Sequence, residues 1–117
     1  MGNYKKLDVY NLAHELTINI YKITRCFPDD EKFSLVSQLR RASLSIPTNI
    51  AEGSGQLSKV NYIRFLGIAR GSSFEVEYLL KLSKDFGYLN EEYYKQLNQQ
   101  NESILRMLNG LIKSLKG

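Results

Sequence analysis

Apolar residues recur along this chain at alternating spacings of three and four, which places them on one face of an α-helix. Four segments share the pattern, and no segment shows the period-two alternation that marks a strand. The four series are Val9, Ala13, Leu16, Ile20, Ile23, Phe27; Leu35, Leu39, Ala42, Ile46, Ile50; Tyr62, Phe65, Ala69, Ser73, Val76, Leu80; and Tyr94, Leu97, Asn101, Ile104, Leu108, Leu111, Leu115. The pattern predicts four amphipathic helices and an all-α fold.

Residues that favour helix ends stand at the borders of these segments. Asp8, Ser58 and Asn90 are placed to cap the first, third and fourth helices, because their side-chain oxygens accept hydrogen bonds from free N–H groups. The acidic turn at 28–31 precedes the second helix, and Gly53-Ser54-Gly55 ends it. Short connections make consecutive helices antiparallel, so we predict an antiparallel up-down-up-down four-helix bundle.

A proline lies inside the second apolar series. Pro47 has no N–H, so the carbonyl of Ser43 loses its helical hydrogen bond. The apolar face nevertheless keeps its phase across the proline, and Ser43 and Ser45 could help to satisfy the freed backbone groups. We therefore predict one helix that is kinked at Pro47 rather than two short helices.

Small residues gather in the middle of the third segment. Each helical glycine costs about 1 kcal/mol relative to alanine, so Gly67 and Gly71 need compensation. Close approach of another helix would supply it, since backbones without bulky side chains gain dispersion contacts. We expect Gly67, Gly71 and Ser72 to pack closely against a helix, either in the same bundle or in another copy of the chain.

Composition fits one globular domain that spans residues 1–117, with 43% hydrophobic and 24% charged residues. The single cysteine, Cys26, and the single histidine, His14, provide neither a disulfide nor a Cys/His metal cluster, so we expect no metal and no cofactor. Apolar stretches are only a few residues long, so we expect no membrane segment and a cytoplasmic location. The net charge of +4 favours weak attraction to polyanions.

The densest group of polar residues lies on the second and third helices. It comprises Arg40, Arg41, Asn49, Glu52, Arg64, Arg70 and Glu75. Arginine forks bind phosphates or carboxylates equally well, so the four arginines are candidates for binding nucleic acid or a partner. Pairing with the carboxylates, within the bundle or across subunits, is the commoner outcome, and Asn49, Glu52 and Glu75 would then form a structural polar network. We expect no catalytic residues, because no carboxylate has a recognisable pocket or proton-transfer partner.

Several motifs occur in a characteristic order. They are Leu7-Asp8-Val9-Tyr10, Phe27-Pro28, Gln38-Leu39-Arg40-Arg41-Ala42, Ser45-Ile46-Pro47-Thr48-Asn49-Ile50-Ala51-Glu52-Gly53, Tyr62-Ile63-Arg64-Phe65-Leu66, Ala69-Arg70-Gly71-Ser72 and Glu75. With them the chain resembles the bacterial four-helix bundle proteins encoded by intervening sequences of 23S ribosomal RNA genes. The resemblance covers residues 7 to about 80 and implies a ring-like homopentamer without established enzymatic activity. The accessory protein of diversity-generating retroelements, which binds a reverse transcriptase and its RNA, is similar but more distant.

Three hypotheses on function stay open from the sequence. The first is a non-enzymatic oligomeric scaffold that binds RNA or an RNA-handling protein through basic surfaces. The second is a purely structural protein–protein interaction module. The third is a small-molecule binder that uses an Arg/Glu pocket, which requires a deep cavity with convergent polar groups inside one chain.

Overall fold

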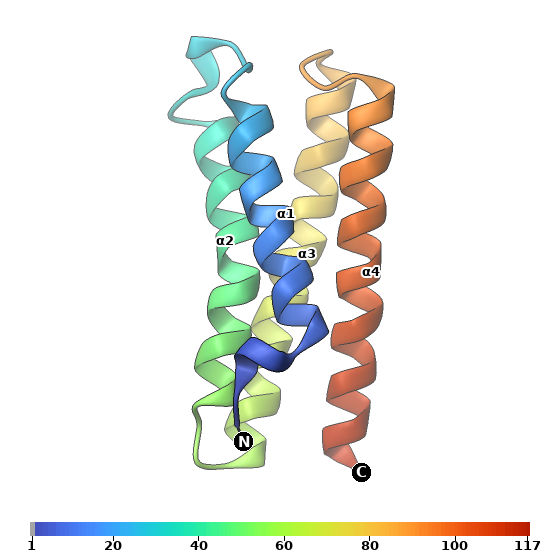
Figure 1. Ribbon diagram of the computed structural model, residues 1–117. Coiled ribbons are helices and arrows are strands. Elements are labelled where there is room, and N and C mark those ends of the chain that lie inside the picture. The colour runs from blue at the N-terminus through green and yellow to red at the C-terminus, as the bar shows by residue number, and fades with distance from the viewer. Residues whose placement is uncertain (1) are drawn as a thin grey trace.

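The computed structural model describes residues 2–117 and consists of four long helices that lie side by side (Figure 1). The helices are α1 (Asp8–Thr24), α2 (Leu35–Ser54), α3 (Lys59–Asp85) and α4 (Glu91–Lys116), with short 3₁₀ turns η1 (Tyr4–Lys6) and η2 (Asp29–Glu31). In Figure 1 the chain ascends α1, descends α2, ascends α3 and descends α4, so both termini lie at the same end. No strand occurs within residues 2–117. The prediction of an all-α four-helix bundle is confirmed.

The core lies along the bundle axis. Each helix contacts two neighbours, since α1 packs on α2, α2 on α3, α3 on α4, and α4 on α1. The largest fully enclosed apolar side chains are Leu16, Ile20, Leu39, Ile46, Ile50, Leu66, Leu80, Ile104 and Leu108. The predicted apolar series supply most of this core. One difference lies in α3, where Leu66 is buried and Phe65 is only half-buried.

Two of the three predicted helix caps are present. The Ser58 hydroxyl accepts a hydrogen bond from the Asn61 N–H at 3.1 Å, and the Asn90 side-chain carbonyl accepts one from the Tyr93 N–H at 2.8 Å. The prediction for Asp8 is wrong, because Asp8 is the first residue inside α1 and the preceding residue provides no side-chain cap. Its carboxylate still lies in the first turn, where the helix dipole favours negative charge.

Helix α2 continues through Pro47, as the phase of the apolar face predicted. The donor that compensates for the missing N–H is not one of the two serines suggested by the sequence. The hydroxyl of Thr17, on α1, lies 3.0 Å from the Ser43 carbonyl oxygen and 2.9 Å from the Ala13 carbonyl oxygen of its own helix, and it can donate to either. The Ser43 hydroxyl itself donates to the Arg40 carbonyl at 3.0 Å. A neighbouring helix therefore places a donor within reach of the carbonyl that the proline leaves free, while the kink itself stays a prediction.

We expect Thr17→Val to lower the free energy of unfolding by about 1–3 kcal/mol, because it removes the buried hydroxyl that lies within hydrogen-bond reach of the Ser43 carbonyl. Thr48→Val is the matched control, since Thr48 is an exposed threonine of α2 whose hydroxyl donates only to the Leu44 carbonyl, at 2.8 Å. The control should change stability by less than about 0.5 kcal/mol. Urea unfolding of the two variants measures the difference. Equal unfolding midpoints would contradict the role of Thr17.

One polar pair is enclosed in the core between α3 and α4. The Ser73 hydroxyl donates to the Asn101 side-chain carbonyl at 2.8 Å, and the Asn101 amide donates to the Ser73 backbone carbonyl at 3.0 Å. Both residues are almost completely buried. Because a shift of one helix along the other would leave these groups unpaired, the pair fixes the register of α3 against α4.

Candidate functional site

The four candidate arginines do not converge on one site. Arg40 lies between α1 and α2, where it lines a surface hollow at the turn that joins them. Arg41 borders a hollow between α2 and α3 that Glu75 also lines. Arg64 is exposed on α3, and Arg70 lines a hollow between α3 and α4. The structure thus distributes these side chains over different faces of the bundle.

The arginines form no ion pair within residues 2–117. The ion pairs of this part of the chain join Lys81 to Asp85 at 3.0 Å and Lys84 to Glu91 at 3.1 Å. Arg70 instead donates to the side-chain carbonyl of Asn109, with Nε at 2.7 Å. The expectation that carboxylates of the same bundle neutralise the arginines is therefore wrong, and pairing across subunits stays a proposal.

The predicted polar network is present only in part. The Asn49 amide donates to the backbone carbonyl and to the hydroxyl of Ser45, at 2.8 and 2.9 Å. The Ser72 hydroxyl donates to the Ser45 hydroxyl at 2.8 Å, which links α3 to α2. The carboxylates of Glu52 and Glu75 are exposed and make no hydrogen bond or ion pair with other described residues. Asn49 and Ser72 thus belong to the helix contact, whereas Glu52 and Glu75 face solvent.

The close approach of two helices occurs at Gly53 and not at the predicted Gly67 and Gly71. A Cβ atom on Gly53 would lie 2.9 Å from the Phe65 Cβ and 3.0 Å from the Tyr62 Cδ1, so α2 and α3 meet there. At Gly67 and Gly71 no described atom outside the local helix lies within 4 Å of such a Cβ. Close packing of Gly67 and Gly71 inside the bundle is therefore wrong. Packing against another copy stays a proposal.

A second stripe runs along the outer side of α3, opposite its core face. We call it the outer α3 stripe, and it consists of Val60, Arg64, Gly67, Gly71, Phe74 and Tyr78. Its spacing of four, three, four, three and four matches the seam of a packed helix. All six residues are exposed, with Val60 at 76% and Tyr78 at 63%. This spacing is visible in the sequence. The core series already predicts a helix over the same residues, so the spacing of the outer stripe was not needed to predict one.

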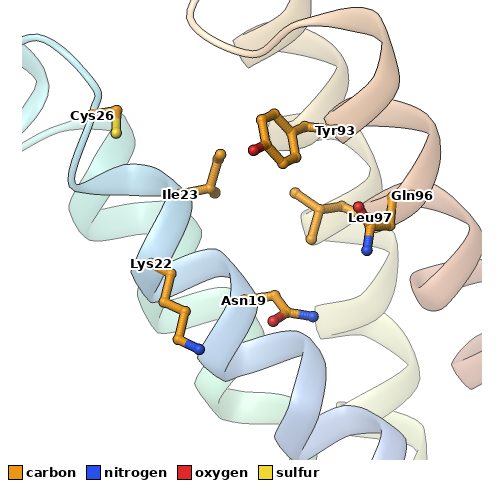
Figure 2. Close-up of a pocket in the computed structure, with 7 residues that line it drawn as sticks. All are labelled: Asn19, Lys22, Ile23, Cys26, Tyr93, Gln96 and Leu97. Atoms are coloured by element: carbon orange, nitrogen blue, oxygen red, sulfur yellow. The ribbon is translucent and has the colours of Figure 1, made fainter.

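A mainly apolar hollow of about 340 Å³ opens between α1 and α4 (Figure 2). Figure 2 shows Ile23 of α1 and Tyr93 of α4 facing each other across it, with Leu97 beside them. Lys22 and Cys26 line its α1 side, and Cys26 is exposed. The arginine and glutamate group does not contribute to this hollow. It is therefore not the Arg/Glu pocket that the small-molecule hypothesis requires.

In the part of the chain that the structure describes, no group of three or more His, Cys, Asp or Glu residues lies close enough together to hold a metal ion. None of the helices in residues 2–117 combines the length and apolar character needed to cross a membrane.

A polar cluster joins the two turns at the end of the bundle opposite the termini (Figure 1). The Tyr88 hydroxyl, after α3, donates to one carboxylate oxygen of Glu31 at 2.9 Å. The Ser34 hydroxyl donates to the other oxygen at 2.7 Å. These two hydrogen bonds, first that of Ser34 and then that of Tyr88, lower the pKa of Glu31 below its ordinary value of 4.5. The Tyr88 ring also packs on Phe27, with centroids 5.5 Å apart.

We expect Tyr88→Phe to lower the melting temperature near neutral pH by a margin that shrinks in acid. Because the folded pKa of Glu31 is depressed, its stabilising effect is complete above about pH 4.5 and is lost as pH falls through the folded pKa. Thermal unfolding of the wild type and the variant across this range measures the margin. Tyr93→Phe is the control, since Tyr93 is exposed, its hydroxyl makes no hydrogen bond with other described residues, and it should show no margin at any pH. A Tyr88→Phe margin that stays constant with pH would contradict the role of Glu31.

Sequence comparison connects this architecture to known proteins. Residues 5–110 match the sequence model of the family described as 23S rRNA-intervening sequence protein. The chain belongs to this family. Its matched range extends past the motifs at 7–80 into α4, where the sequence had shown similarity in type only.

One similar solved structure supports the same assignment. It is the crystal structure, at 1.70 Å resolution, of a protein with unknown function from the S23 ribosomal protein family of Bacteroides thetaiotaomicron VPI-5482. The two chains are 28% identical and superpose with a TM-score of 0.84, over 90% of this chain and 95% of the other. Comparison with curated proteins gives no significant match.

Proposed function

We propose that this chain is a non-enzymatic cytoplasmic scaffold that assembles with copies of itself through the outer α3 stripe and binds RNA or an RNA-handling protein. The observation that carries the proposal is the placement of Gly67 and Gly71. Both glycines lie in the middle of an exposed apolar stripe, and a Cβ atom added to either would have no neighbour within 4 Å outside the local helix. A single chain gives no reason for two helix-destabilising residues at these positions.

Contact with another copy supplies that reason. Two glycines let a second helix approach the α3 backbone, and the gain in dispersion contacts offsets their cost of about 1 kcal/mol each. Phe74 and Tyr78 lie next to them and would be covered by the same contact. Repetition of one such contact between different faces closes a ring. The family resemblance implies five copies, and we propose that number here.

Several exposed charged residues of α2 and α3 suit contacts outside the single chain. Arg41 and Arg64 have no carboxylate partner among the described residues, and neither do Glu52 and Glu75 have a cationic one. In a ring these groups could pair between neighbouring copies. Arginines that remain unpaired would add to the positive electrostatic field of the assembly. Five chains of net charge +4 create this field together, and it attracts RNA phosphates.

The non-enzymatic part of the proposal rests on the same carboxylates. General acid–base catalysis needs a carboxyl group within hydrogen-bond reach of a partner in a pocket that excludes water. Glu52 and Glu75 instead lie exposed on the bundle surface.

RNA binding is tested by filter binding with total cellular RNA at low salt. We expect binding that weakens as salt rises, and Arg70→Gln, which changes an arginine outside the outer α3 stripe, should reduce the slope of log affinity against log salt by about 1. Arg106→Gln removes the same charge from α4, where Arg106 only contacts Ser103, and serves as the control. If neither RNA nor DNA binds at low salt, the nucleic-acid part fails and a purely structural interaction module is favoured instead.

A further inference from the structure

A small hollow at the turn between α1 and α2 collects positive charge. Its volume is about 200 Å³, and it is lined by the cationic side chains of Arg25, Lys32 and Arg40 together with Thr24 and Asp29. The three cations and one carboxylate give the hollow a net charge of +2. None of the four charged groups forms an ion pair with another residue of the described chain.

Three like charges around one hollow repel each other, and the repulsion is stronger where apolar atoms replace water. The buried side chains of Phe27 and Val36 form part of the wall here. A concave surface with walls of low polarity also focuses the field of its charges, which raises the local concentration of anions. The free protein therefore has an unbalanced charge at this place that a bound anion would neutralise.

Arg40 is held in position before any ligand arrives. Its Nε donates to the Thr24 hydroxyl at 2.9 Å, and its Nη2 donates to the Tyr21 carbonyl at 3.2 Å. The guanidinium also lies 4.7 Å from the centroid of the Tyr21 ring, and the Thr24 hydroxyl is fixed by donating to the Ile20 carbonyl at 2.7 Å. An immobilised side chain loses little further conformational entropy on binding.

The guanidinium still has donors to offer. Arginine carries five N–H groups, and these two hydrogen bonds use two of them. The remaining N–H groups of Arg40 form the planar fork that matches two oxygens of a phosphate group. Arg25 and Lys32 are exposed and flexible enough to complete the contact as additional charges.

We propose that this hollow binds a doubly charged phosphate group, either as inorganic phosphate or as the phosphate of a monoester. A phosphomonoester carries a charge of about −1.5 to −2 at neutral pH, which balances the net charge of the hollow. The volume is below that of sites that enclose whole drug-sized ligands, so the rest of the ligand extends into solvent. Internal phosphodiesters of RNA carry one charge each and bind less well. The site lies within one chain and does not rest on the proposed assembly or on RNA binding.

Calorimetric titration of the full-length protein with inorganic phosphate tests the proposal. We expect binding at millimolar concentration or tighter, and a loss of about tenfold or more in Arg25→Gln/Lys32→Gln, because each cation contributes a charge-assisted contact. Neither side chain makes a hydrogen bond or ion pair in the described chain, and their removal relieves the repulsion at the hollow, so the double variant should keep or slightly raise the wild-type melting temperature without phosphate. Lys59→Gln/Lys95→Gln removes equal charge from exposed positions of α3 and α4 and should bind as the wild type does.

A second variant tests the fork itself. Arg40→Lys keeps the charge but loses the planar pair of donors. It should weaken phosphate binding at a temperature where its melting temperature without ligand shows that the variant is folded. Absence of phosphate binding by the wild type, or equal losses in the control pair and the pocket pair, would overturn the proposal.

Oligoribonucleotides then identify the source of the phosphate group. If a 5′-phosphorylated oligonucleotide binds more tightly than its 5′-hydroxyl form, and only the pocket variant loses this preference, the ligand is a nucleic-acid end. If the two forms bind alike while inorganic phosphate binds to the pocket, the ligand is a small phosphate compound. Both results support the site, and neither depends on whether the chain assembles through the outer α3 stripe.

Discussion

Gly53→Val is expected to lower the free energy of unfolding by about 3 kcal/mol, the upper end of the usual cost of overpacking. The added side chain would start 2.9 Å from the Phe65 Cβ and 3.3 Å from the Tyr62 backbone carbonyl. Neither of these atoms is the end of a flexible side chain, so α2 and α3 must move apart where they cross. Core contacts on both helices are then lost as well.

Gly110→Val is the matched control for this variant. Gly110 also lies inside a helix, but a Cβ atom there has no neighbour within 4 Å. Valine is a somewhat better helix former than glycine, so the control should leave stability unchanged or raise it slightly. Urea unfolding followed by circular dichroism compares the two. Similar midpoints for both variants would show that α2 and α3 do not meet closely at Gly53.

Gly71→Leu is expected to abolish assembly without weakening the single bundle. Leucine at this position has open space in one chain, and its helix propensity exceeds that of glycine by about 0.5–1 kcal/mol. The same side chain would prevent a helix of another copy from approaching the outer α3 stripe. The native mass should fall while the unfolding free energy of the monomer stays equal or rises, a combination that general damage to the fold does not produce.

The control for this prediction is Gly110→Leu, which adds the same side chain to an exposed helical glycine outside the stripe. It should retain the native mass of the wild type. Light scattering and urea unfolding of both variants provide the comparison. An unchanged mass of Gly71→Leu would place the subunit contact elsewhere.

The helices could be predicted from the sequence because their pattern depends only on residues that are close together in the chain. The three-four periodicity depends only on neighbouring turns of one helix, so it identified Leu39, Ile46 and Ile50 as core residues without knowledge of the partners. The same logic carried α2 correctly through Pro47, because the apolar phase continued on both sides. Ser58 and Asn90 act as caps through bonds to their own helix, and these were also predicted.

Features that depend on two helices were predicted less well. Thr17 places a donor within reach of the Ser43 carbonyl, and only the position of α1 along α2 brings the two groups together. Whether a glycine is covered depends on the rotation of its helix in the bundle. The rotation of α3 exposes Gly67 and Gly71, while the crossing of α2 buries Gly53.

The four candidate arginines do not form a single site, and the reason is geometric. Neighbouring residues of a helix point about 100° apart, so Arg40 and Arg41 face different grooves of α2. Arg64 and Arg70, six positions apart on α3, also diverge. Their proximity in the sequence suggested one site, but the helical repeat places these arginines in separate hollows. The motifs nevertheless identified the family, because they do not depend on that arrangement.

Copies of this chain should assemble through the outer α3 stripe. Native mass by light scattering at micromolar concentration decides whether they do, with the wild type and Gly71→Leu measured side by side. We expect a wild-type mass of five times the 13.5 kDa chain and a 13.5 kDa species for the variant. A wild type that remains at 13.5 kDa would show that this assembly does not form.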